Sequence, residues 1–309
     1  MKKELLFVMA CLSIVLVGNV SAISWGKIDA TPSSSIAYVE RYGQEEISLD
    51  VVYNPYVVGF MPIYVDVSAT YPDWLTVASN PQTFVLKPGE HYTVKVLLKV
   101  SKHDVVAGTS STVEISLRGK LIGGGAFRQI DEAKITLVVS YNPFTEIAIR
   151  AVTPIERTAP DRELTFIVEV VNYGNSRVIV NLYPEKEPEG WNYVISPPQI
   201  VIDPKKAGDE TFPYETVKIT LTSPHGTAIS YHNKWQDFAI SAKAIAETPY
   251  WVKKGGTWSR STEEIELVNT HTVTAYFLAK NRGFYIPGFD SILLIAGVIL
   301  AGILLRKRK

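Results

Sequence analysis

Hydrophobic and polar residues alternate along most of the chain between residues 23 and 286. Two clear runs lie at residues 94–100 and 217–221. Because successive side chains of a strand point to opposite faces, this alternation predicts strands with one buried face and one solvated face. Similar runs recur at residues 46–52, 63–67, 112–117, 135–139, 164–171, 177–182 and 238–244.

Turn-forming residues separate these runs. Examples are Lys87-Pro88-Gly89, Tyr173-Gly174-Asn175 and the stretch 184–190. No stretch between the two termini has a convincing apolar period of 3.6 residues. Many short strands divided by turn signals are typical of β-sandwiches. The pattern therefore predicts an all-β body.

An internal repeat divides this body in two. Trp74 lies seven residues before Pro81-Gln82, and Trp191 lies seven residues before Pro198-Gln199. The sequence TVKV, which starts at Thr93, is then matched by TVKI, which starts at Thr216. We therefore predict two homologous sandwiches, residues 26–142 and 143–281, which is an ordinary size for a domain.

The N-terminal 22 residues have the pattern of a secretory signal peptide. A basic start, Met1-Lys2-Lys3, precedes an apolar run at residues 5–17, and Val20-Ser21-Ala22 supplies a small-residue exit. We predict cleavage after Ala22. An uncleaved anchor is the alternative, although thirteen apolar residues are few for a span. Cys11, the one cysteine, lies inside this run, so the mature chain would contain no disulfide.

The C-terminal end has the pattern of a short transmembrane helix. Residues 291–305 carry no charge, and Arg306-Lys307-Arg308-Lys309 follow them. A basic cluster of this kind marks the cytoplasmic side. A helix of this length rises about 22 Å, less than the ~30 Å hydrocarbon core of a bilayer. A short span of this kind is better suited to a sorting tag than to a permanent anchor.

The residues before this span carry a family resemblance. Pro287-Gly288-Phe289, then Asp290, the apolar run and the basic end resemble the archaeal PGF-type C-terminal sorting signal over residues 287–309. The resemblance implies a sortase-like processing enzyme, an archaeosortase, that cuts near the tripeptide and transfers the new C-terminus to a membrane lipid. A plain membrane protein with its bulk outside is the alternative. Both place the body at the outer face of the cytoplasmic membrane, with the basic tail cytoplasmic before any processing.

The body carries a second resemblance. The turn Asn172-Tyr173-Gly174-Asn175, followed by Pro188-Glu189-Gly190-Trp191, resembles Ig-like accessory domains found beside carbohydrate-active enzymes and on archaeal surface proteins. The resemblance implies two tandem Ig-like sandwiches that serve as spacers or interaction modules, without activity of their own. Trp74 and Trp191 are expected to fill the sandwich cores, with their N–H groups bonded to backbone.

The charge balance excludes some classes of protein. Lys and Arg number 31 and so do Asp and Glu, so the chain is not a globally basic nucleic-acid binder. Hydrophobic residues make up 46% of the chain, which is too many for a disordered protein. Without the two predicted termini, the body has 25 basic and 29 acidic side chains. A mildly acidic body thus lies between two basic ends that serve export and orientation.

The sequence offers no convincing catalytic or metal site. None of the five histidines lies two to four residues from another, so the local spacing of metal ligands is missing. The adjacent carboxylates at Glu45-Glu46, Asp131-Glu132 and Glu263-Glu264 would point to opposite faces of a strand. We therefore predict a non-enzymatic protein with no catalytic residues, no metal and no cofactor. A dispersed site assembled by folding remains the alternative.

The most unusual segment is 248–261, which has no counterpart in the first copy. It places Tyr250, Trp251 and Trp258 around Lys253-Lys254 and two glycines. It would form a hairpin whose aromatic side chains cover a sandwich edge, or it would bind a partner protein, a sugar or the membrane interface. Trp235 is a weaker candidate of the same kind.

These observations predict a membrane-anchored cell-surface protein that presents two Ig-like modules for adhesion or for binding an envelope protein or glycan. The alternatives are a glycan-binding accessory module and an anchored subunit of a larger surface complex.

Overall fold

The computed structural model describes residues 24–56, 61–102, 104–122, 129–159, 161–224, 235–261 and 270–281. All regular secondary structure in these ranges is β-strand, so the prediction of an all-β body is confirmed. No helix within these ranges is long and apolar enough to cross a membrane. The predicted signal peptide, the sorting motif Pro287-Gly288-Phe289 and the C-terminal helix lie outside the described residues.

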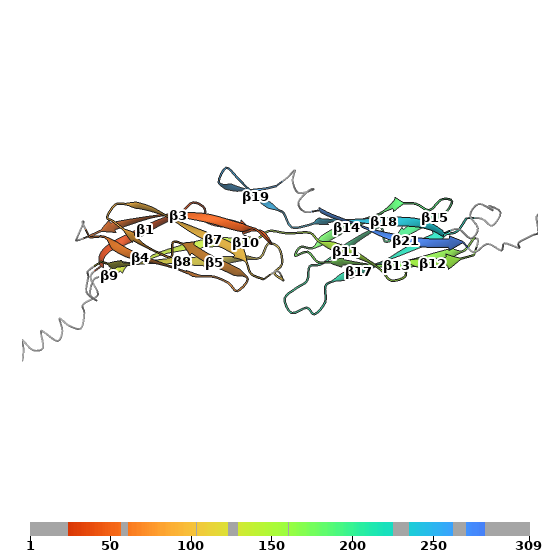
Figure 1. The fold of residues 1–309 in the computed structure, drawn as a ribbon, viewed down its shortest axis with the longest axis horizontal. Coiled ribbons are helices and arrows are strands. Elements are labelled where there is room, and N and C mark those ends of the chain that lie inside the picture. The colour runs from red at the N-terminus through yellow and green to blue at the C-terminus, as the bar shows by residue number, and fades with distance from the viewer. Residues whose placement is uncertain are drawn as a thin grey trace, which may run out of the picture.

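The described residues of the first half of the chain form ten strands (Figure 1). They are β1 (Ser24–Pro32), β2 (Ile36–Val39), β3 (Gln44–Pro55), β4 (Ile63–Thr70), β5 (Leu75–Asn80), β6 (Thr83–Leu86), β7 (His91–Val100), β8 (Ser110–Leu121), β9 (Gln129–Asp131) and β10 (Ala133–Tyr141). One layer has the order β2-β10-β8-β4-β6 and the other β1-β3-β7-β5. The short strand β9 pairs with both β8 and β1, so the two layers join into one ten-stranded sheet.

Eleven strands lie in the part of the second half that the structure describes. They are β11 (Ile147–Ala151), β12 (Ile155–Thr158), β13 (Glu163–Asn172), β14 (Val178–Lys186), β15 (Asn192–Ser196), β16 (Gln199–Ile202), β17 (Tyr214–Thr222), β18 (Trp235–Ala246), β19 (Trp251–Lys254), β20 (Thr257–Arg260) and β21 (Thr270–Asn281). A five-stranded sheet, β12-β21-β18-β14-β16, faces a four-stranded sheet, β11-β13-β17-β15. The hairpin of β19 and β20 belongs to neither sheet.

The two sandwiches have the same topology. Each five-stranded layer begins with an edge strand that pairs in parallel with the last strand of its sandwich, as β2 does with β10 and β12 does with β21. The remaining strands also correspond in order, from β1 and β11 to β8 and β18. The repeated tryptophans stand just before β5 and β15, at equivalent places.

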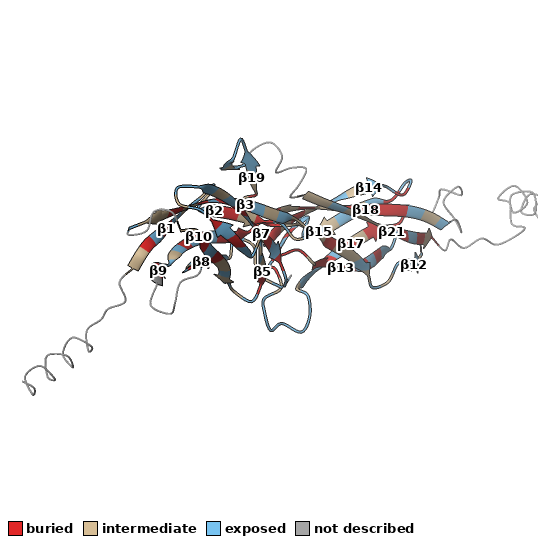
Figure 2. Ribbon diagram, turned by 60° about the vertical axis from the view of Figure 1, so that its left-hand side comes forward, coloured by how far each residue is buried: buried red, intermediate tan, exposed pale blue. Residues whose placement is uncertain are grey.

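Two hydrophobic cores follow from the alternation. Residues of the first core lie between Ile28 and Tyr141, and those of the second lie between Ile147 and Ala279. Figure 2 shows buried positions recurring along the strands of both sandwiches. Trp74 is buried, and its Nε1 donates to Ser111 Oγ at 3.1 Å, a side chain rather than the expected backbone. Trp191 is buried too, so both tryptophans fill their cores as predicted.

The sandwiches lie end to end, and β21 ends at Asn281 on the end of the second sandwich that is far from the first (Figure 1). The second sandwich departs from the first in two connections. The β16–β17 loop spans residues 203–213, whereas its counterpart spans only 87–90. The β18–β21 connection carries the β19–β20 hairpin, whereas its counterpart carries β9. Both longer connections reach the junction between the sandwiches.

Candidate functional site at the interdomain junction

The linker between the sandwiches is held by the Asn-x-Gly-Asn turn that follows β13. The side chain of Asn175 accepts a hydrogen bond from Phe144 N at 2.8 Å and donates to Asn142 O at 3.1 Å. The backbone oxygen of Asn175 accepts a hydrogen bond from Ala107 N of the first sandwich at 2.7 Å. One turn of the second sandwich therefore fixes both the linker and the first sandwich.

This turn requires a glycine in its middle because the linker passes close by. A Cβ atom on Gly174 would lie 2.6 Å from the carbonyl oxygen of Phe144, which is too close for any side chain. The fully buried Asn172 holds the turn from within, since its Oδ1 accepts from Gly174 N and its Nδ2 donates to Ser176 O, both at 2.9 Å. The sequence motif is thus an interdomain contact as well as a turn.

Arg41, in the β2–β3 loop of the first sandwich, reaches across the junction. Its guanidinium forms an ion pair with Glu146 of the linker. It also lies over the ring of Phe144, 4.3 Å from the centroid. The Arg41 side chain is only 25% exposed, so water screens this pair less than it screens a surface ion pair. Arg41 thus makes an ion pair and a cation–π contact with the linker at the same time.

The β19–β20 hairpin lies against the first sandwich (Figure 1). We call residues 250–261 the strap. Trp251 stacks on Tyr38 of β2 with a centroid distance of 4.9 Å and an interplanar angle of 10°. Trp258 meets the same ring edge-on at 5.1 Å and 61°. Tyr38 is thus covered by two aromatic rings from the other half of the chain.

Polar contacts complete the strap. The side-chain amide of Asn142 donates to Trp251 O at 2.9 Å and accepts from Trp251 N at 3.2 Å, as a neighbouring strand would. The hydroxyl of the buried Tyr250 donates to the carboxylate of Glu40. Lys253 forms an ion pair with Glu45, whose side chain is mostly buried. The strap therefore has hydrogen-bonded, ionic and aromatic contacts with the first sandwich.

Two tyrosines near the junction have shifted ionisation. Burial raises the pKa of Tyr38, and it raises the pKa of Tyr141 to about 12. The cause is that removal from water disfavours the charged phenolate. Among the described residues, the Tyr141 hydroxyl has no hydrogen-bond partner. Its ring packs between Trp74 and Phe144, at centroid distances of 6.0 and 6.3 Å.

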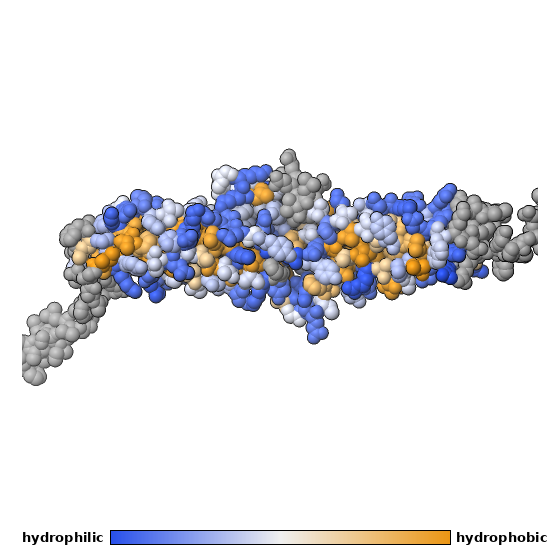
Figure 3. All heavy atoms as spheres, viewed as in Figure 1, coloured by the Kyte–Doolittle hydropathy of each residue, from blue (hydrophilic) through white to orange (hydrophobic). Residues whose placement is uncertain are grey.

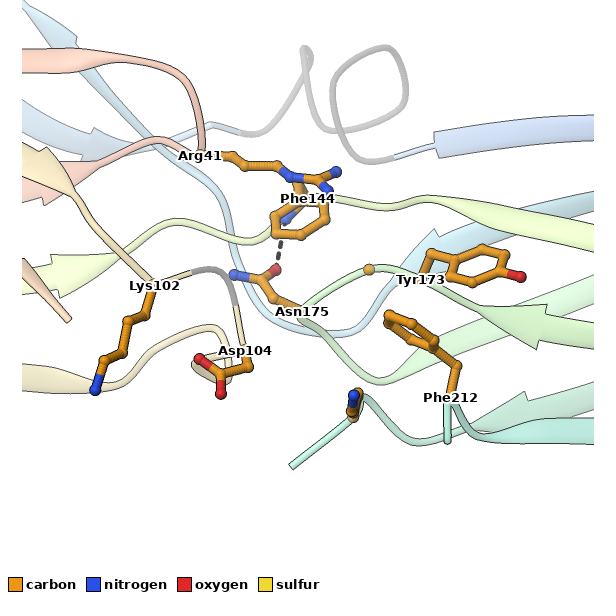
Figure 4. A pocket seen from close by; sticks show the side chains of 9 residues that line it. Arg41, Lys102, Asp104, Phe144, Tyr173, Asn175 and Phe212 are labelled. Carbon is orange, nitrogen blue, oxygen red and sulfur yellow. Dashed lines mark hydrogen bonds between the residues drawn. The ribbon is translucent and has the colours of Figure 1, made fainter. Parts of the chain in front are cut away.

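A hollow of about 370 Å³ lies beside the linker (Figure 4). Its lining combines the rings of Phe144, Tyr173 and Phe212 with the cationic side chains of Arg41, Lys102 and Lys205. Asp104 is the one carboxylate among these lining residues, so the lining offers no pair of carboxylates for acid–base chemistry. The hollow thus places three aromatic rings and three cationic side chains beside the linker.

The structure separates the four aromatic residues that the sequence singled out. Tyr250, Trp251 and Trp258 lie together in the strap, where they contact the first sandwich. Trp235 begins β18 at the opposite end of the second sandwich. Residues 251–260 do form a hairpin, as one of the interpretations of this segment expects. Its aromatic side chains cover an edge of the first sandwich rather than of the second, to which the segment belongs in sequence. No group of three or more metal-ligating side chains occurs within the described ranges.

Sequence reasoning missed the residues of the first sandwich that receive the strap. Tyr38, Glu40 and Arg41 lie in an ordinary strand and turn, and no local pattern distinguishes them. The first copy has no counterpart of residues 248–261, and this difference could have indicated the contact. The aromatic side chains of such an insertion are expected to pack against another surface of the protein. Asn175 was visible only as part of a turn motif.

Comparisons with known proteins find similarity only among solved structures. No family model matches the chain, and no curated protein sequence matches it. The solved structures similar to it include a PapD-like domain of human CEP192, with 13% identity, 46% of this chain and 89% of that chain covered, and a TM-score of 0.30. The E. coli chaperone DraB has 11% identity, with 83% and 98% covered and a TM-score of 0.27.

Another similar structure comprises domains 4 and 5 of the S-layer protein SbsC, with 14% identity, 68% of this chain and 77% of that chain covered, and a TM-score of 0.25. At such scores none of these likenesses carries an argument about function or partners. The functional argument therefore depends on the residues of the junction.

Proposed function

We propose that this chain is a non-enzymatic cell-surface protein, anchored in the membrane by its C-terminal end, whose two sandwiches act as one stiff module for adhesion or for binding an envelope partner. The observation that carries the proposal is the strap, which crosses from the second sandwich to the first. Two domains joined by a linker alone move relative to each other unless a substantial interface restrains them. Here the strap adds that restraint.

The restraint acts on two neighbouring loops of the first sandwich. The strap contacts Tyr38, Glu40 and Glu45 of β2, the β2–β3 loop and β3. The linker contacts Arg41, next to Glu40, and the Asn-x-Gly-Asn turn contacts Ala107 in the β7–β8 loop. A hinge motion about the linker would break at least one of these sets. Stiffness of this kind supports a role in which a binding surface is held at a set distance and direction.

The direction follows from the position of the last strand. Asn281 lies at the end far from the first sandwich, and the sequence then continues toward the predicted anchor at residues 287–309. With the anchor in the membrane, the second sandwich stands next to the bilayer and the first sandwich points away from it. The surfaces most accessible to an envelope partner are then those of the first sandwich and of the junction.

The glycan-binding alternative finds some support in the hollow beside the linker, because aromatic rings and cations can bind an acidic sugar. The strap supports it less. Trp251 has one ring face against Tyr38, so that face is not available to a sugar. An anchored subunit of a larger complex would use the same outward surfaces.

The proposal is tested on intact cells that produce the chain. We expect the body to be removed by external protease while the membrane fraction retains the C-terminal part or its lipid-linked product. Intact-mass analysis then reports processing: loss of Arg306 to Lys309 supports the sorting tag, and their retention supports a plain anchor. A protein that stays in the cytoplasm, or that leaves the cell without membrane association, would refute the proposal.

Binding is tested separately. The purified chain should bind envelope preparations from its own cells, and a glycan array distinguishes the accessory-module alternative. Lack of binding to either would leave the anchored module without the adhesive role and would overturn that part of the proposal.

A further inference from the structure

An exposed apolar patch lies on the outer face of the five-stranded sheet of the second sandwich. It consists of Ile155, Trp235, Tyr276 and Leu278, which are 54%, 42%, 69% and 38% exposed. We call these four residues the end patch, because they lie toward the end of the sandwich at which β21 finishes. Figure 3 shows apolar residues between hydrophilic margins on the second sandwich in the view of Figure 1.

The register of the strands gathers these residues on one face. Ile155 of β12 stands opposite Leu278 of β21, and Trp235 of β18 stands opposite Lys280. The alternate residues of β21, Phe277 and Ala279, point inward and are almost fully buried. The core is therefore complete without the outer residues. Exposed apolar groups that gather in one place commonly mark an interaction surface.

Two cations lie over the tryptophan of the end patch. The guanidinium carbon of Arg157 is 5.0 Å from the ring centroid of Trp235, and Lys280 Nζ is 5.5 Å from it. Among the described residues, neither cation has an ion-pair partner. The nearby Asp237 is paired with Lys186 at 2.6 Å, so it does not neutralise them. The end patch thus combines apolar, aromatic and cationic side chains.

We infer that the end patch docks onto the anionic headgroup surface of the membrane. The inference rests on the proposed function, because it takes the C-terminal end to be the anchor. Residues 282–290 separate Asn281 from the apolar run, and nine extended residues span at most about 30 Å. If the apolar run lies in the membrane, Asn281 therefore stays within about 30 Å of it, and the end patch beside Asn281 is within reach of the bilayer surface.

The chemistry of the end patch suits this surface. Trp and Tyr favour the interfacial level of a bilayer, where an apolar ring can be buried while its polar group stays wet. Each Lys or Arg near an anionic surface contributes about 1 kcal/mol of attraction. A protein partner would gain less binding energy than an anionic membrane surface from two cations over one ring. Binding to a protein would also not require that the end patch lie near the membrane anchor. Docking would bring the end of this sheet face against the headgroups and tilt the long axis of the molecule, while the first sandwich still points away from the bilayer.

The test places an environment-sensitive fluorophore on the patch. In the full chain with Cys11→Ser, a single cysteine at Leu278 is labelled with NBD, and the protein is reconstituted into vesicles of 70% phosphatidylcholine and 30% phosphatidylglycerol. The matched control carries the label at Val194, which is 62% exposed on the other sheet of the same sandwich. We expect a blue shift and several-fold stronger quenching by brominated lipid at position 278 than at position 194.

Charge provides a second measurement. The variant with both Arg157→Gln and Lys280→Gln should lose most of the shift at position 278, as should the parent protein in vesicles of phosphatidylcholine alone. Vesicle flotation reports anchoring independently of the label. Flotation of the protein with a water-exposed label at position 278 would refute docking of the end patch but support membrane anchoring. Absence of flotation would refute both the docking and the anchoring. Shielding of the label without vesicles, dependent on protein concentration, would assign the patch to a second copy and refute the inference.

Discussion

Replacing Trp251 by alanine should release the strap while both sandwiches stay folded. Trp251 belongs to neither core, and its ring contacts Tyr38 of the first sandwich. The change removes the stacked ring but leaves the backbone hydrogen bonds of Trp251 with Asn142 available. The expected effect is therefore on the position of the strap and on the relative movement of the sandwiches, rather than on the unfolding of either.

The size of the effect follows from the contact. A tryptophan buries about 150–250 Å² when fully covered. Trp251 is only partly covered, so the apolar area lost on truncation is about 100 Å², which is worth ~2.5 kcal/mol at 25 cal/mol per Å². The stacked pair adds about 0.5–1.5 kcal/mol. A total of about 3–4 kcal/mol corresponds to a population of the open strap raised by a few hundredfold, at about 1.36 kcal/mol for each factor of ten.

Two measurements report this opening. Hydrogen exchange of the β19 and β20 amides should become faster, while exchange in the sandwich cores stays unchanged. Double electron–electron resonance between spin labels at the exposed positions Tyr64 and Val194 should show a broader distance distribution in Trp251→Ala than in the parent protein. The matched control is Trp235→Ala, which removes the same side chain at the far end of the second sandwich. Unchanged exchange and unchanged distances in Trp251→Ala would refute the stiffening role of the strap.

Three further predictions concern the junction and the core. Gly174→Ala should destabilise the protein by about 1–3 kcal/mol, measured by urea unfolding, because its Cβ would lie 2.6 Å from Phe144 O; equal stability would show that the linker can move aside at no cost. The pKa of Tyr141 is raised to about 12, so the stability that comes from its protonated form is complete below pH 10 and is lost as the pH rises toward 12. Tyr141→Phe should therefore lose less stability than the parent between pH 10 and 12 in urea titrations, and parallel curves would contradict this. Trp74→Ala should lower the thermal midpoint of the first sandwich, because it leaves a cavity that costs about 3–5 kcal/mol and removes the hydrogen-bond donor of Ser111. Calorimetry should then resolve a separate unfolding transition of the second sandwich at higher temperature. A single transition that moves as a whole would contradict this and show tighter coupling between the sandwiches.

The strands themselves were predictable because their signal is local. The alternation at residues 94–100 and 217–221 became β7 and β17, whose inward residues are buried. The repeat was visible because a tryptophan and a Pro-Gln pair recur at fixed spacing. The identical strand order of the two halves is what a repeated sequence pattern requires. The assignment of both halves to an Ig-like class stays a prediction.

The junction was not predictable because its contacts join distant residues. Tyr250 and Glu40 are separated by 210 positions, and their pairing depends on how two finished sandwiches meet. Trp251 and Trp258 stand out in the sequence, but the ring that they contact belongs to β2, which carries no special motif. The strand β9, which joins the two layers of the first sandwich, is three residues long and lies below the length that periodicity can detect.

If the chain is exported as we propose, the strap also sets an order of events during its export. A chain that leaves the cell N-terminus first presents the first sandwich before residues 250–261 emerge, and domains generally fold as units in that order. Tyr38 and its carboxylate neighbours would therefore wait, uncovered, until almost the whole chain has crossed. The closing of the strap would then be one of the last steps of maturation. An exported chain that stops short of residue 250 could fold its first sandwich and still show a bare aromatic surface, a difference that quality-control proteases could recognise.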